Sequence, residues 1–301
     1  MHSNKPYTDF SDFIANYFKG KVQKISINAG FTCPNRDGTK GIGGCTYCNN
    51  QTFNPDYCKP NKSITAQLEE GKIFFSRKYP SMQYLAYFQA YTNTYADVDA
   101  AISMYEEALS FDGIVGIIVG TRPDCMPEAL LQYLAKLSDT HFVLVEYGVE
   151  TAHDSTLKLI NRCHSWAESV NAITETAAAG VLCGVHVIMG LPGETEDMML
   201  QTIDKLCQLP ISTIKIHQLQ LIRGTKMAND VESGIYSVPL WSAEQYIDLC
   251  CNIVKRISKK IAIERFVSQS PDELLISPRW GLKNYQFTNL LLKKLSSTID
   301  D

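Results

Sequence analysis

The chain has 301 residues, of which 45% are hydrophobic and 20% charged, and its net charge is −4. This length suits one large domain, the composition excludes extensive disorder, and the charge gives no overall sign of nucleic-acid binding. No apolar run approaches the roughly 18 residues needed to cross a membrane, and the N-terminus lacks a signal-peptide pattern, so we expect a cytoplasmic protein with no membrane partner.

The predicted elements alternate between strands and helices. Apolar runs predict strands at residues 21–28, 84–90, 113–120, 141–148, 181–189, 213–219 and 261–267. Helical spacing and capping residues predict helices at residues 64–78, 97–111, 127–137, 165–179, 195–209 and 242–260. Near-continuous apolar strands separated by helices are typical of a parallel sheet covered by helices. We therefore predict an α/β fold with six strand–helix units from Val22 to about Lys260.

Three cysteines, Cys33, Cys45 and Cys48, lie in a glycine-rich loop directly after the first predicted strand. Three thiolates can hold three irons of a cubane cluster and leave the fourth iron open to a small chelating ligand. A zinc site would need a fourth ligand or a water, and Cys58 is the nearest further thiol. The alternatives of structural zinc and of a fortuitous group of thiols stay open on spacing alone. Tyr47, between the last two thiols, is expected to pack on a cofactor or to fill a gap in the core.

Five segments resemble radical SAM enzymes, most closely the YhcC/YtqA-type family, which is related to the Elp3-like branch. These segments are residues 31–38 (FTCPNRDG), 43–48 (GGCTYC), 120–124 (GTRPD), 146–151 (EYGVET) and 189–195 (MGLPGET). The resemblance spans roughly residues 20–280. The cysteine spacing is longer than the common Cys-x3-Cys-x2-Cys loop, as is expected for this family.

The resemblance implies a partial (β/α)6 TIM-like barrel with a short C-terminal extension. We expect an N-terminal segment at residues 1–20, the core barrel with the cluster loop at residues 21–260, and the extension at residues 261–301. Ligands in such sheets bind at the carboxyl ends of the strands.

The resemblance also implies a chemistry and its cofactors. They are a 4Fe–4S cluster, held by Cys33, Cys45 and Cys48, and S-adenosylmethionine (SAM), which the reduced cluster cleaves to a 5′-deoxyadenosyl radical. That radical abstracts hydrogen from a substrate in the barrel. An electron donor such as flavodoxin or ferredoxin is the implied partner.

Five further residues are expected to contact SAM through the same resemblance: Thr92, Asn93, Glu150, Arg162 and Gly190. Thr92 and Asn93 would offer oxygens to the SAM amine, or form an ordinary turn. Glu150 would bind the ribose hydroxyls, and Arg162 the methionyl carboxylate, unless it is an exposed helix-end arginine. Gly190 would let the backbone approach the adenine.

Other polar residues near strand ends have less defined roles, and we assign no catalytic residue from the sequence. Arg122 and Asp124 are expected to bind substrate or to lock their loop as an ion pair. Glu194 and Thr195 suit a helix cap. We expect His186 in the core, and we place three residues on the substrate side by position alone: His217, Gln218 and Gln220.

The substrate is not defined by the sequence. Relatives in the Elp3-like branch act on the wobble uridine of tRNA, which makes tRNA one candidate partner. Radical chemistry on a small metabolite is the alternative, and a non-enzymatic zinc-binding interaction module is a third hypothesis.

Overall fold

The structure, a computed structural model, describes residues 5–52, 54–76 and 82–297. Within these residues, seven strands form one parallel sheet in the order β1-β2-β3-β4-β5-β6-β8. The strands are β1 (Val22–Ile27), β2 (Gln83–Phe88), β3 (Ile114–Thr121), β4 (Phe142–Glu150), β5 (Leu182–Met189), β6 (Thr213–Gln218) and β8 (Ala262–Arg265).

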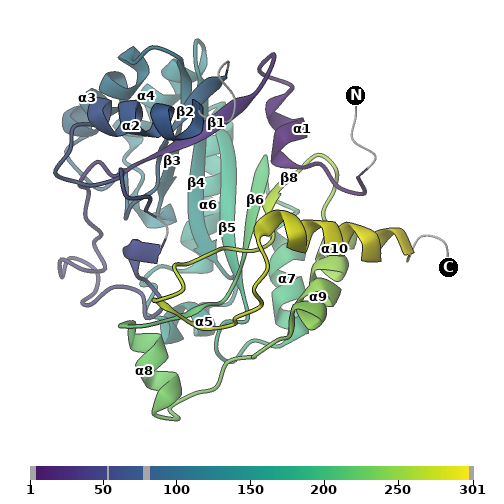
Figure 1. Cartoon of the computed structure of the whole chain (residues 1–301). Coiled ribbons are helices and arrows are strands. Elements are labelled where there is room, and N and C mark those ends of the chain that lie inside the picture. The colour runs from purple at the N-terminus through teal and green to yellow at the C-terminus, as the bar shows by residue number, and fades with distance from the viewer. Residues whose placement is uncertain (1–4, 53, 77–81, 298–301) are drawn as a thin grey trace.

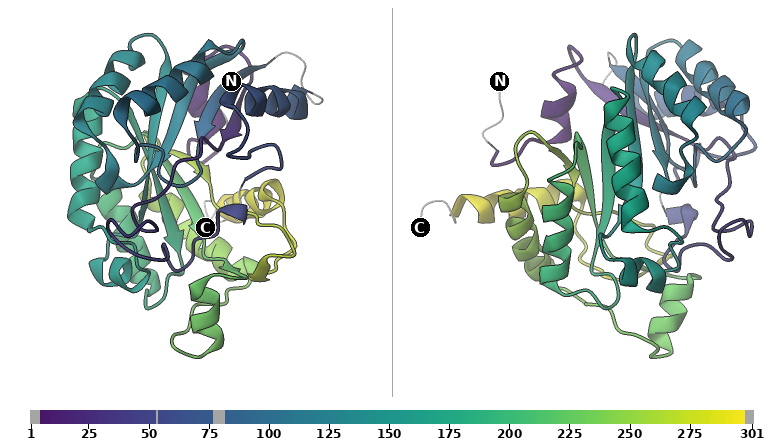
Figure 2. Two further views of the ribbon diagram at one scale, coloured as in Figure 1. Left: turned by 90° about the vertical axis from the view of Figure 1, so that its left-hand side faces the viewer. Right: turned by 180° about the vertical axis from the view of Figure 1, so that it is seen from behind.

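Helices between the strands cover the outer face of this curled sheet. Figure 1 shows α2, α3 and α4 grouped beside the first strands and α7, α9 and α10 beside the last. The rear view in Figure 2 shows the long helix α6 against the middle of the sheet. Their bounds are α2 (Ile64–Ser76), α3 (Val98–Ser110), α4 (Glu128–Ser138), α6 (Trp166–Ala178), α7 (Glu196–Leu206), α9 (Ala243–Arg256) and α10 (Asn284–Ser297).

The predicted partial barrel is confirmed, with one addition. Strand β8, predicted as a strand at residues 261–267 but assigned to the C-terminal extension, pairs with β6 and adds a seventh parallel strand to the six predicted strand–helix units. The helix predicted for residues 64–78 is seen to Ser76, and its predicted end lies outside the described residues. Helix α10 was not predicted.

Local sequence explains where the helices begin. Ser165 and Ser242 each accept a hydrogen bond from a backbone N–H three residues later, and the side chains of Glu168 and Gln245 accept one from the backbone N–H of the cap residue. These capping boxes satisfy N–H groups that have no partner inside the helix. Thr195 caps α7 by accepting from the Met198 N–H, which confirms its expected capping role.

The concave side of the sheet is layered. At the amino ends of the strands, helix α1 (Phe10–Ile14) packs its apolar residues against inward-facing strand residues. The buried members of this layer are Phe13, Ile14, Leu85, Tyr87, Ile118, Phe142, Leu144 and Ala262. This apolar layer closes the half-barrel at the amino ends of its strands and leaves the carboxyl end for a site.

Shorter elements gather at the carboxyl ends of the strands. They are α5 (Asp154–Leu159), α8 (Lys226–Glu232), the 3₁₀ turns at Asn50–Thr52 and Pro123–Cys125, and the antiparallel pair β7 (Leu221–Ile222) and β9 (Leu275–Ser277). Figure 1 shows α5 and α8 below the sheet, at the end opposite α1. In the described part of the chain we find no helix with the length and apolarity that a membrane crossing requires.

Candidate functional site

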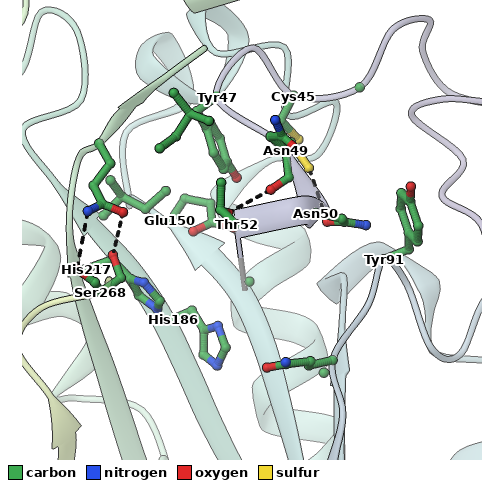
Figure 3. A pocket seen from close by; sticks show the side chains of 18 of the residues that line it. Cys45, Tyr47, Asn49, Asn50, Thr52, Tyr91, Glu150, His186, His217 and Ser268 are labelled. Carbon is green, nitrogen blue, oxygen red and sulfur yellow. Dashed lines mark hydrogen bonds between the residues drawn. The ribbon is translucent and has the colours of Figure 1, made fainter. Parts of the chain in front are cut away.

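A cavity of about 260 Å³ opens at the carboxyl ends of the strands and contains most of the predicted site residues. Its wall includes Cys33, Cys45 and Cys48 of the loop after β1, and Glu150 and Arg162 of the segment around α5. Figure 3 shows Cys45 and Tyr47 at one side of the cavity, Glu150 near its middle, and His186 and His217 on the strands below. The cysteine loop and the polar residues of the sheet therefore share one space.

The cysteine loop is held by a segment more than a hundred residues later. Asn161 donates hydrogen bonds to the carbonyl oxygens of Gly44, at 2.9 Å, and Ile42, at 3.3 Å. The buried Asn35 donates to the Asn161 carbonyl and, at 3.5 Å, to the Cys45 thiol. These bonds fix the loop around Cys45 from both sides.

The thiols fit a cluster in which each thiolate binds a different iron and the fourth iron has no protein ligand. Cys33 and Cys45 are each 8% exposed and Cys48 is half-buried, yet all three reach the cavity wall. In the described residues, no three His, Cys, Asp or Glu side chains converge tightly enough to hold one metal ion in common. A cubane cluster needs no such convergence, because its thiolates bind different irons.

Arg162 and Glu150 form a polar pair next to the thiols. The guanidinium donates to the Gly148 carbonyl at 2.6 Å and to the Cys45 sulfur at 3.5 Å, and lies 3.4 Å from the Glu150 carboxylate. Both side chains are nearly buried, so Arg162 is not an exposed helix-end arginine. Glu150 has a φ of +67°, an uncommon backbone conformation that aims its side chain into this space.

Thr92 and Asn93 differ in position. Thr92 lines the cavity, and its buried hydroxyl has no hydrogen-bond partner among the described residues. Asn93 does not line it. Instead, its side-chain amide donates to the carbonyls of Phe88, at 3.1 Å, and Gly120, at 2.7 Å, and so ties the turn to the ends of β2 and β3.

Gly190 also lies away from the cavity wall. Its φ is +89°, and a Cβ there would come within 2.9 Å of the Trp241 ring. Its N–H lies 3.0 Å from the Met199 sulfur. Glycine at this position is thus required by the turn and by packing against Trp241.

Arg122 and Asp124 lock their loop, which was one of the two expected roles. The Arg122 guanidinium binds both carboxylate oxygens of Asp124, at 2.9 and 3.0 Å, and donates to the Arg162 carbonyl at 2.8 Å. Lys40 of the cysteine loop approaches the same carboxylate at 2.6 Å. Burial alone would raise the pKa of Asp124, but these two cations outweigh it and lower the pKa to about 2. Arg122 also lines the cavity.

A charged quartet that sequence reasoning missed lies beneath the cavity. Lys24 contacts the carboxylates of Glu146, at 3.2 Å, and Glu264, at 2.6 Å. Lys215 contacts the same two, at 2.7 and 2.9 Å. Burial would raise the pKa of Glu146, but the two lysines outweigh it and hold that pKa well below its ordinary value.

Two histidines, His186 and His217, line the cavity. His186, expected in the core, faces the interior with Nε2 2.8 Å from the Glu146 carboxylate, so it is satisfied as a core histidine would be but lies in the cavity wall. Burial, and then the neighbouring Lys215, lower its pKa. His217, Gln218 and Gln220 also line the wall, on the side expected for substrate.

Glu194 and Tyr47 have structural contacts in addition to any cofactor role. Glu194 accepts a hydrogen bond from Thr151 at 2.5 Å, and burial raises the pKa of this carboxyl. Tyr47 lines the cavity and packs against the apolar cluster that contains Ile160 and Ile188.

Comparison with known proteins identifies the class. The family model of the Radical SAM superfamily matches residues 28–206, and that of the Radical SAM C-terminal domain matches residues 211–297. Together, fold and site define a radical SAM protein, with a 4Fe–4S cluster and S-adenosylmethionine as its cofactors.

Two relatives cover nearly the whole chain. YtqA of Bacillus subtilis is 33% identical over 296 residues, which is 98% of this chain and 91% of that protein. YhcC of Escherichia coli is 36% identical over 282 residues, 93% of this chain and 89% of that protein. The chain belongs to the YtqA/YhcC family of the radical SAM superfamily.

Solved structures share the fold. Elp3 of Methanocaldococcus infernus aligns with a TM-score of 0.71 at 16% identity, over 93% of this chain and 64% of that one. SuiB of Streptococcus suis bound to S-adenosylmethionine aligns with a TM-score of 0.52 at 12% identity, over 82% and 51%. At these identities the likeness establishes the half-barrel alone.

Proposed function

We propose that Cys33, Cys45 and Cys48 hold the 4Fe–4S cluster and that SAM binds beside it, against Thr92, Glu150 and Arg162, in an enzyme that acts on a substrate in the rest of the cavity. The observation that carries this proposal is that the thiol loop and the Arg162–Glu150 pair line one cavity at the carboxyl end of the sheet.

The bound cofactors supply a 5′-deoxyadenosyl radical, with the electron coming from a donor such as flavodoxin or ferredoxin. The chain's own residues bind and orient. Arg162 offers a planar cation to the methionyl carboxylate, Glu150 offers acceptors to the ribose hydroxyls, and the unpartnered Thr92 hydroxyl can accept from the ammonium group. Tyr47 and Ile188 present apolar surface that excludes water from the cavity.

Iron content tests the cluster assignment. After anaerobic reconstitution, we expect about four irons per chain in the wild type and a loss of most of them in Cys45→Ala, because the variant lacks one of three thiolate ligands. Cys58→Ala is the matched control. Cys58 is buried outside the loop, so this variant should keep its iron. Equal iron loss in the control, or a colourless wild type that holds zinc, would favour the zinc module instead.

We propose the wobble uridine of tRNA as a second candidate substrate, beside a small metabolite. What supports it is a match of 23% identity over 182 residues, 60% of this chain and 33% of the relative, to the tRNA uridine(34) acetyltransferase of Methanocaldococcus infernus. Mass spectrometry of tRNA nucleosides from cells with and without the gene tests it. A modified uridine that changes supports the tRNA substrate, and an unchanged nucleoside profile contradicts it.

A further inference from the structure

The cavity floor carries one cation more than its carboxylates can balance. In the quartet, two lysines face two carboxylates, so Lys24, Lys215, Glu146 and Glu264 sum to no net charge. Arg265, the last residue of β8, lines the cavity beside them. Among the residues that the structure describes, no carboxylate lies within ion-pair distance of its guanidinium.

The polar atoms around Arg265 do not neutralise it. Its Nη2 lies 3.4 Å from each ring nitrogen of His217, and its buried Nε has no hydrogen-bond partner among the described residues. Burial, and then Arg265 itself, lower the pKa of His217 well below its ordinary value, so this imidazole is neutral at pH 7. The ring of His186 lies next to that of His217, with 5.5 Å between the two centroids.

A half-buried guanidinium without a counter-ion is costly, because low-dielectric surroundings replace the water that would solvate it. An anion that enters the cavity would offset this unfavourable desolvation energy. The planar donors of arginine match the oxygens of carboxylate and phosphate. Gln218 and Gln220 of the same wall are already engaged with the backbone of Ser268, at 2.9 and 3.3 Å, which leaves Arg265 as the donor open to a ligand.

We propose that Arg265, with His217 beside it, binds an anionic group of the substrate, a carboxylate or a phosphate, at the floor of the cavity. The proposal rests on the proposed function, since it takes this part of the cavity as the substrate side. It narrows the substrate to molecules that carry such an anionic group.

Calorimetric titration of the reconstituted full chain with acetate and with inorganic phosphate, at fixed ionic strength and pH 7.5, tests the proposal. We expect one anion to bind with a measurable heat, and Arg265→Gln to raise its Kd by about tenfold or more, because a charge-assisted hydrogen bond is lost. Arg265→Lys keeps the positive charge and should lose less anion affinity than Arg265→Gln. Tighter binding of acetate assigns a carboxylate substrate, and tighter binding of phosphate assigns a phosphate ester.

Arg256→Gln is the matched control, because Arg256 is 38% exposed and pairs with Asp204 on the outer surface. The proposal is overturned if neither anion binds the wild type, if Arg265→Gln and Arg265→Lys both bind as the wild type does, or if the control loses as much affinity as Arg265→Gln. The titration needs no reductant and no SAM cleavage. A wild type that fails to cleave SAM would therefore count against the proposed function, whereas the anion affinities test the role of Arg265 independently.

Discussion

At the scale of single residues, Gly148 makes room for the Arg162–Glu150 pair. A Cβ at Gly148 would lie 2.5 Å from the Arg162 guanidinium and 2.8 Å from the Glu150 carboxylate. Both contacts are with the ends of flexible side chains at a cavity wall. The two side chains would therefore move, and the backbone would stay in place.

We therefore expect Gly148→Ala to raise the Kd for SAM by about tenfold, since each charged group would leave its binding position, while the free energy of unfolding changes by less than about 1 kcal/mol. Equilibrium dialysis and urea unfolding measure the two. Gly116→Ala offers the contrast, because its Cβ would meet the Phe142 carbonyl at 2.2 Å and should reduce stability instead. Unaltered SAM affinity in Gly148→Ala would contradict the assignment of this pair.

Position after a strand, together with the family resemblance, selected Cys33, Glu150 and Arg162, which line the cavity, and Asn93 and Gly190, which do not. The last two could not be separated from the others in advance, because a turn residue that faces a cavity and one that ties the turn to the sheet have the same sequence signal. The contact of Asn161 with Gly44 spans 117 positions, and no local pattern predicts it.

At the scale of elements, α1 closes the half-barrel at the amino ends of its strands. Phe13 is 8% exposed, and its ring lies 6.5 Å from Phe142 and 5.3 Å from Tyr17, measured between centroids. A five-residue helix cannot be stable alone, so its position depends on this aromatic contact.

Phe13→Ala should lower the free energy of unfolding by about 3–5 kcal/mol, because it leaves a void against the strands. Phe74→Ala on α2 is the control: that ring is 60% exposed, and its loss should cost about 1 kcal/mol or less. Urea unfolding measures both. Equal small losses would mean that α1 does not seal the barrel.

Most elements could be predicted because the strand–helix alternation is strong. Helix α10 was missed although its buried residues Phe287, Leu291 and Leu295 recur every four positions. Its signal was present, but the segment follows the last predicted strand, where the strand–helix alternation required no further helix. The short helices α5 and α8 are too brief for periodicity to identify them.

At the scale of the whole molecule, the barrel interior changes from an apolar layer at the amino ends of the strands, through the charged quartet, to the cavity at their carboxyl ends. On β4 the inward residues are Phe142, Leu144, Glu146, Gly148 and Glu150, and they pass through all three layers. A single glutamate inside the apolar run of β4 and a single lysine inside that of β6 were the available signals for the quartet. Pairing them required the sheet order, which the sequence does not state.

Lys215→Met should destabilise the fold by about 3–5 kcal/mol, because it leaves two buried carboxylates facing one lysine. Adding Glu146→Gln should recover part of that loss, since it removes the excess negative charge. Urea unfolding of both single variants and the double variant forms a cycle. Additive losses would show that the quartet does not act as a unit.

The most direct measurement of the central claim is the formation of 5′-deoxyadenosine from SAM by the anaerobically reconstituted, chemically reduced protein. The account predicts this product in the wild type and its loss, by at least about a hundredfold, in Cys45→Ala. A wild type with four irons bound that makes no 5′-deoxyadenosine would contradict it.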